Sequence, residues 1–467
     1  MKASQSSSNC RRRSNASVLI IVLWIAIGML SIALYFANSM NYELRASDNR
    51  VSGLAADQAI EGAARYVSYI LYNYATNGAM PLTNQYQAAA VPVGNAHFWF
   101  IGHDPSETPS SDPYFSLVDE ASKFNLNTVG TNTLVAMPNV SADFAEAILD
   151  WRSTNSLGLN SLDYNSLGYD DKNAPFETVD ELRLVYGATM DVLVGNDPNL
   201  NGVLDSNEKD NGGSGQVQPG LFEYCTVYTR EPNYLVYNGE DILLTNVSTV
   251  GRTELDGLFS SAGVSTSYAS QLYTYTHPTG TAGGGGATHA FNGILDFCVE
   301  CKNLGMSSED FAKIYPNVTT STSSYIRGRI NINTASPTVL AALFWGIGYN
   351  QGVDESTAES AAENVINYRQ QNQQNLNSVA WIVDALGTSS PVIKALQTGD
   401  FITVHTYQFS ADIAAVGPFG RGYRRVKFIF DTSDGTPVIL YRQDLSGLGW
   451  ALGDKARQTW VANASHE

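Results

Sequence analysis

The sequence predicts an α+β protein in which a long N-terminal helix packs on an antiparallel sheet that carries a large inserted helical region. Three observations lead to this fold class. An apolar run near the N-terminus continues into a helical pattern, the middle of the chain contains an internal repeat, and the C-terminal part alternates apolar and polar residues. The 467 residues are enough for two or three hydrophobic cores.

The chain is strongly acidic, with 45 Asp and Glu against 27 Lys and Arg and a formal net charge of −18. This charge disfavours nucleic acid as a partner, because phosphate binding needs clustered Lys and Arg, and it favours cations. Only 15% of the residues are charged, against roughly 25% in an average soluble domain. The composition is typical of an exported bacterial surface protein rather than of a cytosolic enzyme.

The N-terminal element is predicted to cross a membrane. Residues 1–16 are polar and basic, and the following run from Val18 to Ala37 holds 20 residues without a charge. At about 1.5 Å per residue, such a helix spans the hydrocarbon core of a bilayer. The arginines at 11–13 place the leading side in the cytoplasm, so that the rest of the chain faces outward.

This helix is expected to continue beyond the membrane. The stretch from Glu43 to Thr76 contains no proline, and its apolar residues recur with the 3.6-residue period of an amphipathic helix. We therefore expect one helical element over 17–78. A signal peptide cleaved near Ala37-Asn38-Ser39 is the alternative, although the apolar region of a signal peptide is usually only about 7–15 residues long.

A membrane helix that continues as an amphipathic helix resembles type IV pilins and the pseudopilins of type II secretion. The order Arg-Arg-Arg-Ser-Asn-Ala before the apolar run resembles the leader of the minor pseudopilin K family. That family commonly carries Trp at its eighth mature residue. Counting back from Trp24 places the new N-terminus at Ser17 and the residue before the cut at Ala16, where the family usually has Gly. The resemblance implies a leader over 1–16, cleavage by prepilin peptidase and methylation of the new N-terminus.

The resemblance also implies a place in the filament. Most pilins carry a Glu at the fifth mature residue that pairs with the N-terminus of a neighbour, whereas protein K lacks it and this chain has Ile21 there. The implied role is to cap the tip of the pseudopilus and to initiate its assembly for protein export. The implied location is the bacterial inner membrane, with a pilin-like C-terminal domain in the periplasm. The implied partners are the I- and J-type minor pseudopilins, the major pseudopilin and the inner-membrane assembly platform.

Two stretches in the middle of the chain are similar to each other. Lys-Phe-Asn-Leu-Asn-Thr at 123–128 matches Arg-Ile-Asn-Ile-Asn-Thr at 329–334. Further matches pair Ala145, Ile148, Trp151 and Arg152 with Ala362, Val365, Tyr368 and Arg369, and Phe176, Val179, Leu182 and Gly187 with Leu376, Val379, Ile382 and Gly387. Each copy predicts a short extended stretch followed by about three helices, which resembles helix-hairpin-helix or SAM-like modules.

This repeat supports an alternative function, that of a membrane-anchored DNA-binding protein of a DNA-uptake system. In DNA-binding modules of this kind a Gly-apolar-Gly hairpin offers backbone N–H groups to a phosphate, and the second copy contains Gly-Ile-Gly at 346–348. Asp354 and Glu355 follow this hairpin where Lys or Arg would be needed. The sequence therefore favours a tight interhelical turn, and no nucleic-acid partner.

The segment 197–208, Asp-Pro-Asn-Leu-Asn-Gly-Val-Leu-Asp-Ser-Asn-Glu, fits the twelve-residue calcium loop of an EF-hand. Oxygen-bearing side chains stand at positions 1, 3, 5, 9 and 12, and Gly202 permits the sharp turn at position 6. The predicted calcium ligands are Asp197, Asn199, Asn201, the carbonyl of Val203, Asp205 and Glu208. An acidic surface turn is the alternative.

The calcium loop is expected to stand alone. The Gly-rich segment 210–219 disfavours the exiting helix of a full EF-hand, so we expect a structural ion that pins a long connection. Members of the protein K family bind calcium, so the resemblance implies the same ion. Asp210 offers one more carboxylate for a second ion.

The sequence gives no signature of an enzyme. Its six histidines are scattered, and it contains no HExxH, GxSxG or phosphate-loop motif. Cys298 and Cys301 form one CxxC pair without a second, which favours a buried or disulfide-linked pair over a metal site.

The predicted organisation has six parts. These are a leader over 1–16, the N-terminal helix over 17–78, the first head strands over 79–117, an inserted α-domain with the calcium loop over 118–324, a second helical repeat module over 325–390 and the C-terminal sheet over 391–467. The resemblance thus implies a minor pseudopilin. A DNA-binding protein and an exported calcium-stabilised domain are the competing interpretations.

Overall fold

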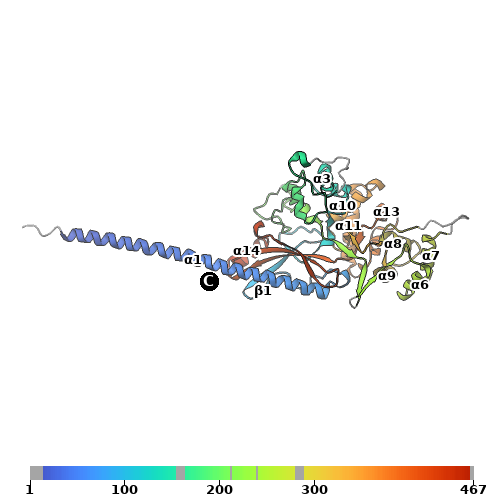
Figure 1. The fold of residues 1–467 in the computed structure, drawn as a ribbon, viewed down its shortest axis with the longest axis horizontal. Coiled ribbons are helices and arrows are strands. Elements are labelled where there is room, and N and C mark those ends of the chain that lie inside the picture. The colour runs from blue at the N-terminus through green and yellow to red at the C-terminus, as the bar shows by residue number, and fades with distance from the viewer. Residues whose placement is uncertain (1–13, 154–163, 211–212, 238–239, 279–288, 463–467) are drawn as a thin grey trace, which may run out of the picture.

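The computed structural model describes residues 14–153, 164–210, 213–237, 240–278 and 289–462. A long helix, α1, projects from a head in which a sheet and a group of shorter helices lie side by side (Figure 1). The predicted pilin-like fold class, a long N-terminal helix on an antiparallel sheet with a helical insertion, is confirmed. Residues 1–13 of the predicted leader, which include Cys10, lie outside the described residues.

Helix α1, Ser14–Tyr74, is one continuous helix of 61 residues, which is about 90 Å long at 1.5 Å per residue. Its second half lies on the sheet and buries mainly small side chains, including Ala56, Ala59, Ala63 and Val67. Small side chains at three- and four-residue spacing form one apolar stripe and let the helix approach the sheet closely. The amphipathic pattern therefore positions the second half of α1.

The head sheet joins strands from the two ends of the chain. Its strands are β1 (Val91–Val93), β2 (Ala96–Gly102), β3 (Tyr114–Phe115), β4 (Val118–Asp119), β15 (Gln408–Val416), β16 (Arg424–Asp431) and β17 (Val438–Asp444). The order is β1-β2-β15-β16-β17, with β3 on β2 and β4 on β15, and every pairing is antiparallel. The helical region is therefore inserted between β4 and β15.

Alternating side chains give the sheet two apolar faces. Phe98 and Phe100 of β2 are buried in the core beneath α1, while Trp99 and Ile101 belong to a second small core on the other face. This period of two is that of a strand covered on both sides. The remaining elements of the head are the 3₁₀ turns at Thr76–Gly78, Pro418–Gly420 and Ser446–Leu448 and helix α14 (Gly453–Ala462).

The inserted helical region packs around one large core. Up to residue 243 its helices are α2 (Thr131–Val135), α3 (Ala142–Arg152), α4 (Met190–Leu193) and α5 (Leu221–Tyr224), with 3₁₀ turns at Glu120–Ser122, Tyr164–Leu167 and Val179–Leu184; its strands are β5 (Phe124–Asn125), β6 (Cys225–Thr226), β7 (Arg230–Pro232), β8 (Tyr234–Tyr237) and β9 (Glu240–Leu243).

Beyond residue 243 the region is mainly helical. Its helices are α6 (Arg252–Ser261), α7 (Thr266–Thr276), α8 (Ile294–Asn303), α9 (Ser308–Ile314), α10 (Pro337–Gly348), α11 (Glu355–Gln371), α12 (Ala380–Leu386) and α13 (Pro391–Leu396), with 3₁₀ turns at Tyr315–Asn317, Tyr349–Gln351 and Gln373–Asn375; its strands are β10 (Thr245–Asn246), β11 (Val318–Thr319), β12 (Tyr325–Arg327), β13 (Ile330–Asn331) and β14 (Ile402–Thr403).

The two copies of the internal repeat make equivalent hydrogen bonds. Asn125 Oδ1 accepts from the N–H of Asn127 at 2.9 Å, and Asn331 Oδ1 accepts from the N–H of Asn333 at 3.0 Å. Each copy also closes with a parallel strand pair, β5 with β6 and β13 with β14. We call residues 124–226 the first module and residues 330–403 the second module.

The matched arginines hold the same turn in both modules. Arg152 donates to the carbonyls of Leu126 and Val129, the latter at 2.7 Å. Arg369 donates to the two corresponding carbonyls of the second module at 3.3 and 2.8 Å. The shifted sequence alignment therefore identified structurally equivalent residues.

A third copy, which we did not predict, lies between these two modules. In residues 245–319, here called the intervening module, Asn246 Oδ1 accepts from the N–H of Ser248 at 3.0 Å. The N–H of Val247 donates to the carbonyl of Thr319 at 3.0 Å, and the equivalent bonds of the first and second modules measure 2.8 and 3.0 Å. Strands β10 and β11 form the same parallel pair. The helical region thus contains three related modules.

The second module extends past residue 390, where we expected the C-terminal sheet to begin. Helix α13 buries Val392, Ile393 and Leu396 in the large helical core, and β14 pairs with β13. Helix α13 and strand β14, which precede the head strand β15, therefore belong to the helical region.

Candidate functional site

The predicted calcium loop follows α4 in the first module, and the ends of its connection are tied together. An isolated bridge joins Gly195 to Pro219, and the N–H of Asn196 donates to the carbonyl of Gln218 at 3.1 Å. Gly195 has φ +66°, and a Cβ built on it would lie 1.9 Å from the carbonyl oxygen of Gln218. Only glycine fits this closure, which holds the loop in place at its base.

Asp197 organises the first turn of the loop. Its Oδ1 accepts from the N–H of Asn201 at 3.1 Å, and its Oδ2 accepts from the N–H of Gly202 at 2.8 Å. Gly202 has φ +77°, the left-handed conformation that we predicted for position 6. The carboxylate at position 1 therefore closes the turn within the loop itself.

The other predicted ligands converge on Asp205. The side-chain amides of Asn199 and Asn201 both donate to Asp205 Oδ2, at 2.7 and 3.0 Å. The N–H of Asp205 donates to Glu208 Oε2 at 2.9 Å, and the N–H of Val203 donates to Asn201 Oδ1 at 3.0 Å. All six predicted ligands thus belong to one compact loop.

The loop holds acceptor oxygens and negative charge that are not compensated within it. Asn199 Oδ1 and Glu208 Oε1 are buried without a hydrogen-bond partner. Burial raises the pKa of Asp197 to about 6, although the hydrogen bonds from Gly202 and Asn201 act to lower it. Burial also raises the pKa of Glu208 to about 7, to which repulsion from Asp197 and Asp205 contributes. A bound cation would relieve both effects.

The donor set fits a hard cation such as calcium, because carboxylate, amide and carbonyl oxygens are its usual ligands. Among the residues that the structure describes, no group of three His, Cys, Asp or Glu side chains could hold a metal ion by itself. The amide oxygens of Asn199 and Asn201 and the Val203 carbonyl would have to complete the set, and both amides would have to turn their oxygens towards the ion.

No helix follows Glu208 in the described residues before α5 begins at Leu221. Asp210 accepts from the N–H groups of Ser214 and Gly215 at 3.2 and 2.8 Å and so caps a separate turn. The predicted ligands thus form a loop without the exiting helix of an EF-hand.

The first half of α1 is the candidate membrane segment. Every side chain from Val18 to Phe36 is exposed, including Trp24 at 72%, and the helix is long and apolar enough to cross a membrane. Ile21, the fifth residue after the predicted cut, is exposed in this segment. Ala16 and Ser17 lie in the first turn of α1. Such an apolar surface requires lipid or other helices around it.

We expected Gly-Ile-Gly at 346–348 to form a tight interhelical turn, but these residues are the last three of α10, and the turn follows at Tyr349–Gln351 with Gly352 at φ +81°. Gly346 is buried, and a Cβ built on it would lie 2.4 Å from the Cα of Thr133 in the first module. The N-terminus of α11 is occupied as well, since Asp354 Oδ1 accepts from the N–H of Thr357 at 2.8 Å. A phosphate would meet a carboxylate at this position, which disfavours the alternative.

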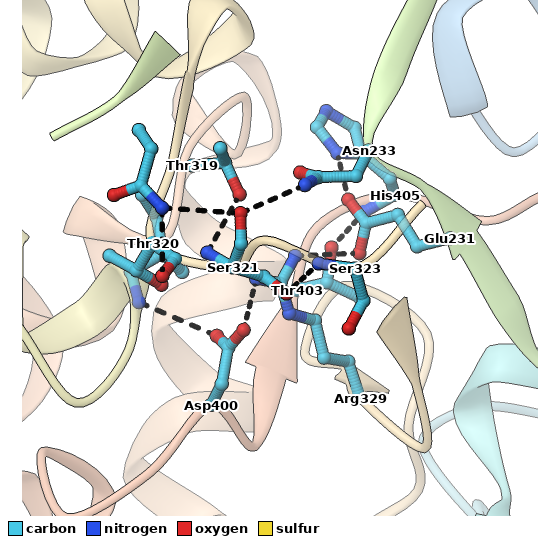
Figure 2. A network of polar contacts seen from close by, with 12 residues as sticks. Glu231, Asn233, Thr319, Thr320, Ser321, Ser323, Arg329, Asp400, Thr403 and His405 are labelled. Atoms are coloured by element: carbon cyan, nitrogen blue, oxygen red, sulfur yellow. Dashed lines mark hydrogen bonds and ion pairs between the residues drawn. The ribbon is translucent and has the colours of Figure 1, made fainter. Parts of the chain in front are cut away.

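A buried ion network that we did not predict lies where the modules meet (Figure 2). Arg329 Nη1 lies 3.0 Å from Glu231 Oε2, and the other end of its guanidinium pairs with Asp400. His405 Nδ1 lies 3.0 Å from Glu231 Oε1. Burial alone would raise the pKa of Glu231, but Arg329 and His405 lower it to about 2. The signal for this network was the basic residue that precedes the Asn turn, Lys123 in one copy and Arg329 in the other.

The described cysteines show no reactive site. Cys225, Cys298 and Cys301 are free and buried, so the CxxC pair is not a disulfide. Burial raises the pKa of Cys225 to about 12 and raises that of the other two thiols as well. These thiols therefore serve as packing groups in the helical core.

A cavity of about 1790 Å³ lies between the head sheet and the first and second modules. Its lining is rich in Ser, Thr, Asn and Gln, and it includes Gly202 of the calcium loop and the pair His103–Glu223, whose Nε2 and Oε2 are 2.9 Å apart. Acidic side chains outnumber basic ones in this lining, which includes Lys123 and Arg369 and the acidic residues Asp104, Glu107, Asp112, Asp119 and Glu223.

No protein-family model matches this chain, and no curated protein matches it. Among solved structures, the chain is similar to a chain in the crystal structure of the GspK-GspI-GspJ complex from the enterotoxigenic Escherichia coli Type 2 Secretion System. The two are 13% identical, with a TM-score of 0.38, and the match covers 86% of this chain and 99% of the other. The similarity is remote.

Proposed function

We propose that this chain is a minor pseudopilin of a bacterial type II secretion system, where it caps the tip of the pseudopilus and initiates its assembly. The observation that carries the proposal is α1, in which an exposed apolar half continues without a break into a half that packs on the head sheet. A signal peptide that is cleaved off does not need to form one continuous helix with the folded domain. A subunit that leaves the bilayer and enters a helical bundle needs this continuity.

The proposed position at the tip is supported by Ile21, the fifth residue of the predicted mature chain. Ile21 carries no charge and cannot neutralise the N-terminal amine of another subunit, as the Glu of other pilins does. A subunit without this ion pair suits the tip of the filament. The proposed partners are I- and J-type minor pseudopilins and, below them, the major pseudopilin and the inner-membrane assembly platform. The helical region would then form part of the periplasmic tip.

Calcium is part of this proposal as a structural ion. Asp197, Asn199, Asn201, Asp205 and Glu208 with the Val203 carbonyl would hold it, and its charge would offset the crowded carboxylates. We propose no catalytic role, and the burial of Gly346 within α10 together with the net charge of −18 makes DNA binding the weaker alternative.

The test is the intact mass and N-terminal sequence of the protein extracted from native membranes. We expect the mature chain to begin at Ser17 with a methylated amine. An Ala16→Gly variant should be cut at the same bond, because the family that this chain resembles usually has Gly there. An Ala16→Glu variant, which places a large charged side chain before the cut, should stay uncut. A start near Met40, or an uncut wild-type chain, would overturn the pseudopilin proposal and leave the calcium loop unaffected.

A further inference from the structure

Arg425 of β16 is fully buried and reaches out of the head sheet to the predicted calcium loop, more than 200 residues earlier in the chain. Its Nη2 donates to the carbonyl of Leu200 at 2.8 Å, and its Nη1 donates to the carbonyl of Asn199. The same guanidinium is held from within the sheet by Asp412 of β15, through Nε at 2.9 Å and Nη2 at 2.6 Å. One side chain therefore connects two strands of the sheet to the loop.

The two carbonyls belong to positions 3 and 4 of the loop, between the predicted ligands Asp197 and Asn201. Leu200 has φ +54°, a left-handed conformation that is unfavourable for a residue with a side chain. Hydrogen bonds to a charged guanidinium are among the stronger ones, and here they fix the backbone at both carbonyls. Arg425 thus selects the strained turn that brings the ligands together.

Two further contacts fix the loop to the head. The side-chain amide of Asn199 donates to the carbonyl of Trp450 at 3.3 Å. A Cβ built on Gly202 would lie 3.4 Å from Nδ1 of His103, so the far side of the turn rests on the segment that follows β2. Three segments of the head that are distant in sequence therefore surround a loop that belongs to the first module.

We propose that Arg425, held by Asp412, is the positioning residue of the calcium loop, and that calcium binding clamps the inserted helical region to the head sheet. This inference rests on the proposed calcium site. Arg425 does not touch the ion; it holds the backbone from which two ligands project. Because coupling is reciprocal, a loop positioned by Arg425 binds calcium more tightly, and bound calcium strengthens the contact between loop and sheet.

The test uses the full-length protein in detergent, stripped with EDTA and titrated with CaCl₂ by calorimetry. Arg425→Lys keeps the charge opposite Asp412 but cannot reach both carbonyls, and it should bind calcium at least tenfold more weakly. The matched control is Arg424→Lys on the same strand, whose side chain pairs with exposed Asp57 on α1 and not with the loop. This control should bind calcium like the wild type. Thermal unfolding of both variants in EDTA checks that the difference does not arise from loss of the fold.

A second measurement needs no variant. Hydrogen exchange of the wild-type protein with and without calcium should show added protection in residues 424–431 and 446–452 of the head as well as in the loop. Equal affinity of Arg425→Lys and wild type, or protection confined to the loop, would overturn the clamp while calcium binding stands. If the wild-type protein itself takes up no calcium, the calcium site and the clamp both fail, and the pseudopilin proposal is untouched.

Discussion

The second module and the intervening module share one turn but secure it by different means. In the second module a buried Arg369 holds the turn and Arg329 anchors its start, whereas the intervening module has Thr276 and Leu244 at the corresponding positions. Both still close the same parallel strand pair. The comparison teaches that the turn forms without the charged residues. Where they are present, they brace the turn and attach it to neighbouring segments.

The largest effect should come from Gly346 in the first helix of the second module, and the first helix of the intervening module offers Gly257 for comparison. A Cβ at Gly346 would lie 2.4 Å from the backbone of Thr133, whereas a Cβ at Gly257 would meet nothing within 4 Å. Gly346→Ala should therefore lower the free energy of unfolding by about 3 kcal/mol, while Gly257→Ala should raise it by about 0.5–1 kcal/mol through helix propensity. Urea denaturation followed by circular dichroism measures both. Equal effects would mean that the contact between the first and second modules does not constrain the structure.

The arginine of the second module should have the next largest effect. Arg369 donates to three backbone carbonyls, those of Ile332, Ala335 and Pro105, and its loss would leave them unpaired. We expect Arg369→Ala to cost about 2–3 kcal/mol in the same assay. Thr276→Ala, the matched change in the intervening module, removes bonds only to Leu272 and Tyr273 of its own helix and to the adjacent His277, and it should cost less than about 1 kcal/mol. A similar cost for both would show that the arginine is not what fastens the second module.

The ion network of Figure 2 should make the attachment of the second module sensitive to acid. The folded-state pKa of Glu231, about 2, lies below its unfolded value, so its contribution to stability is present above about pH 4 and is lost as the pH falls towards 2. Glu231→Gln should destabilise the protein by about 2 kcal/mol at pH 6, and this difference from the wild type should shrink by pH 3. Unfolding midpoints of the two proteins across this pH range provide the measurement. A difference that does not depend on pH would exclude the carboxylate charge as its cause.

The smallest difference in stability should be the one between alanine substitutions of Asn331 and Asn246, the asparagines that begin the two turns. Asn331 bonds the N–H of Asn333 and also donates to the buried carboxylate of Asp119 at 2.7 Å. Asn246 makes the same turn bond, and its other contacts, to Thr320 and Ser321, are longer than 3.2 Å. Asn331→Ala should cost about 2 kcal/mol and Asn246→Ala about 1 kcal/mol, because only Asn331→Ala removes a donor from a buried carboxylate. Thr334, Thr406 and the N–H of Ala121 would still donate to Asp119. The reverse order would contradict this view of the intervening module as the less firmly anchored copy.

Prediction from sequence worked where the local pattern carries the structural reason. The continuous α1 followed from a charge-free run joined to a 3.6-residue period, and the two predicted modules followed from the repeated Asn turn and its arginine. The intervening module was missed although Asn-Val-Ser-Thr-Val-Gly at 246–251 resembles Asn-Leu-Asn-Thr-Val-Gly at 125–130. Ser248 replaces the second Asn and Thr276 replaces the arginine, and these were the residues on which the comparison depended.

The sequence by itself determined the elements whose physics is local: the length and apolar surface of α1, the left-handed glycine of the predicted calcium loop, and the Asn turns. Only the tertiary structure decided what those elements meet, because such contacts join residues far apart in the chain. It buried Gly346 against Thr133 and set Arg425 beneath the calcium loop. Neither contact leaves a periodic trace in the sequence, since each depends on how the modules and the sheet pack together.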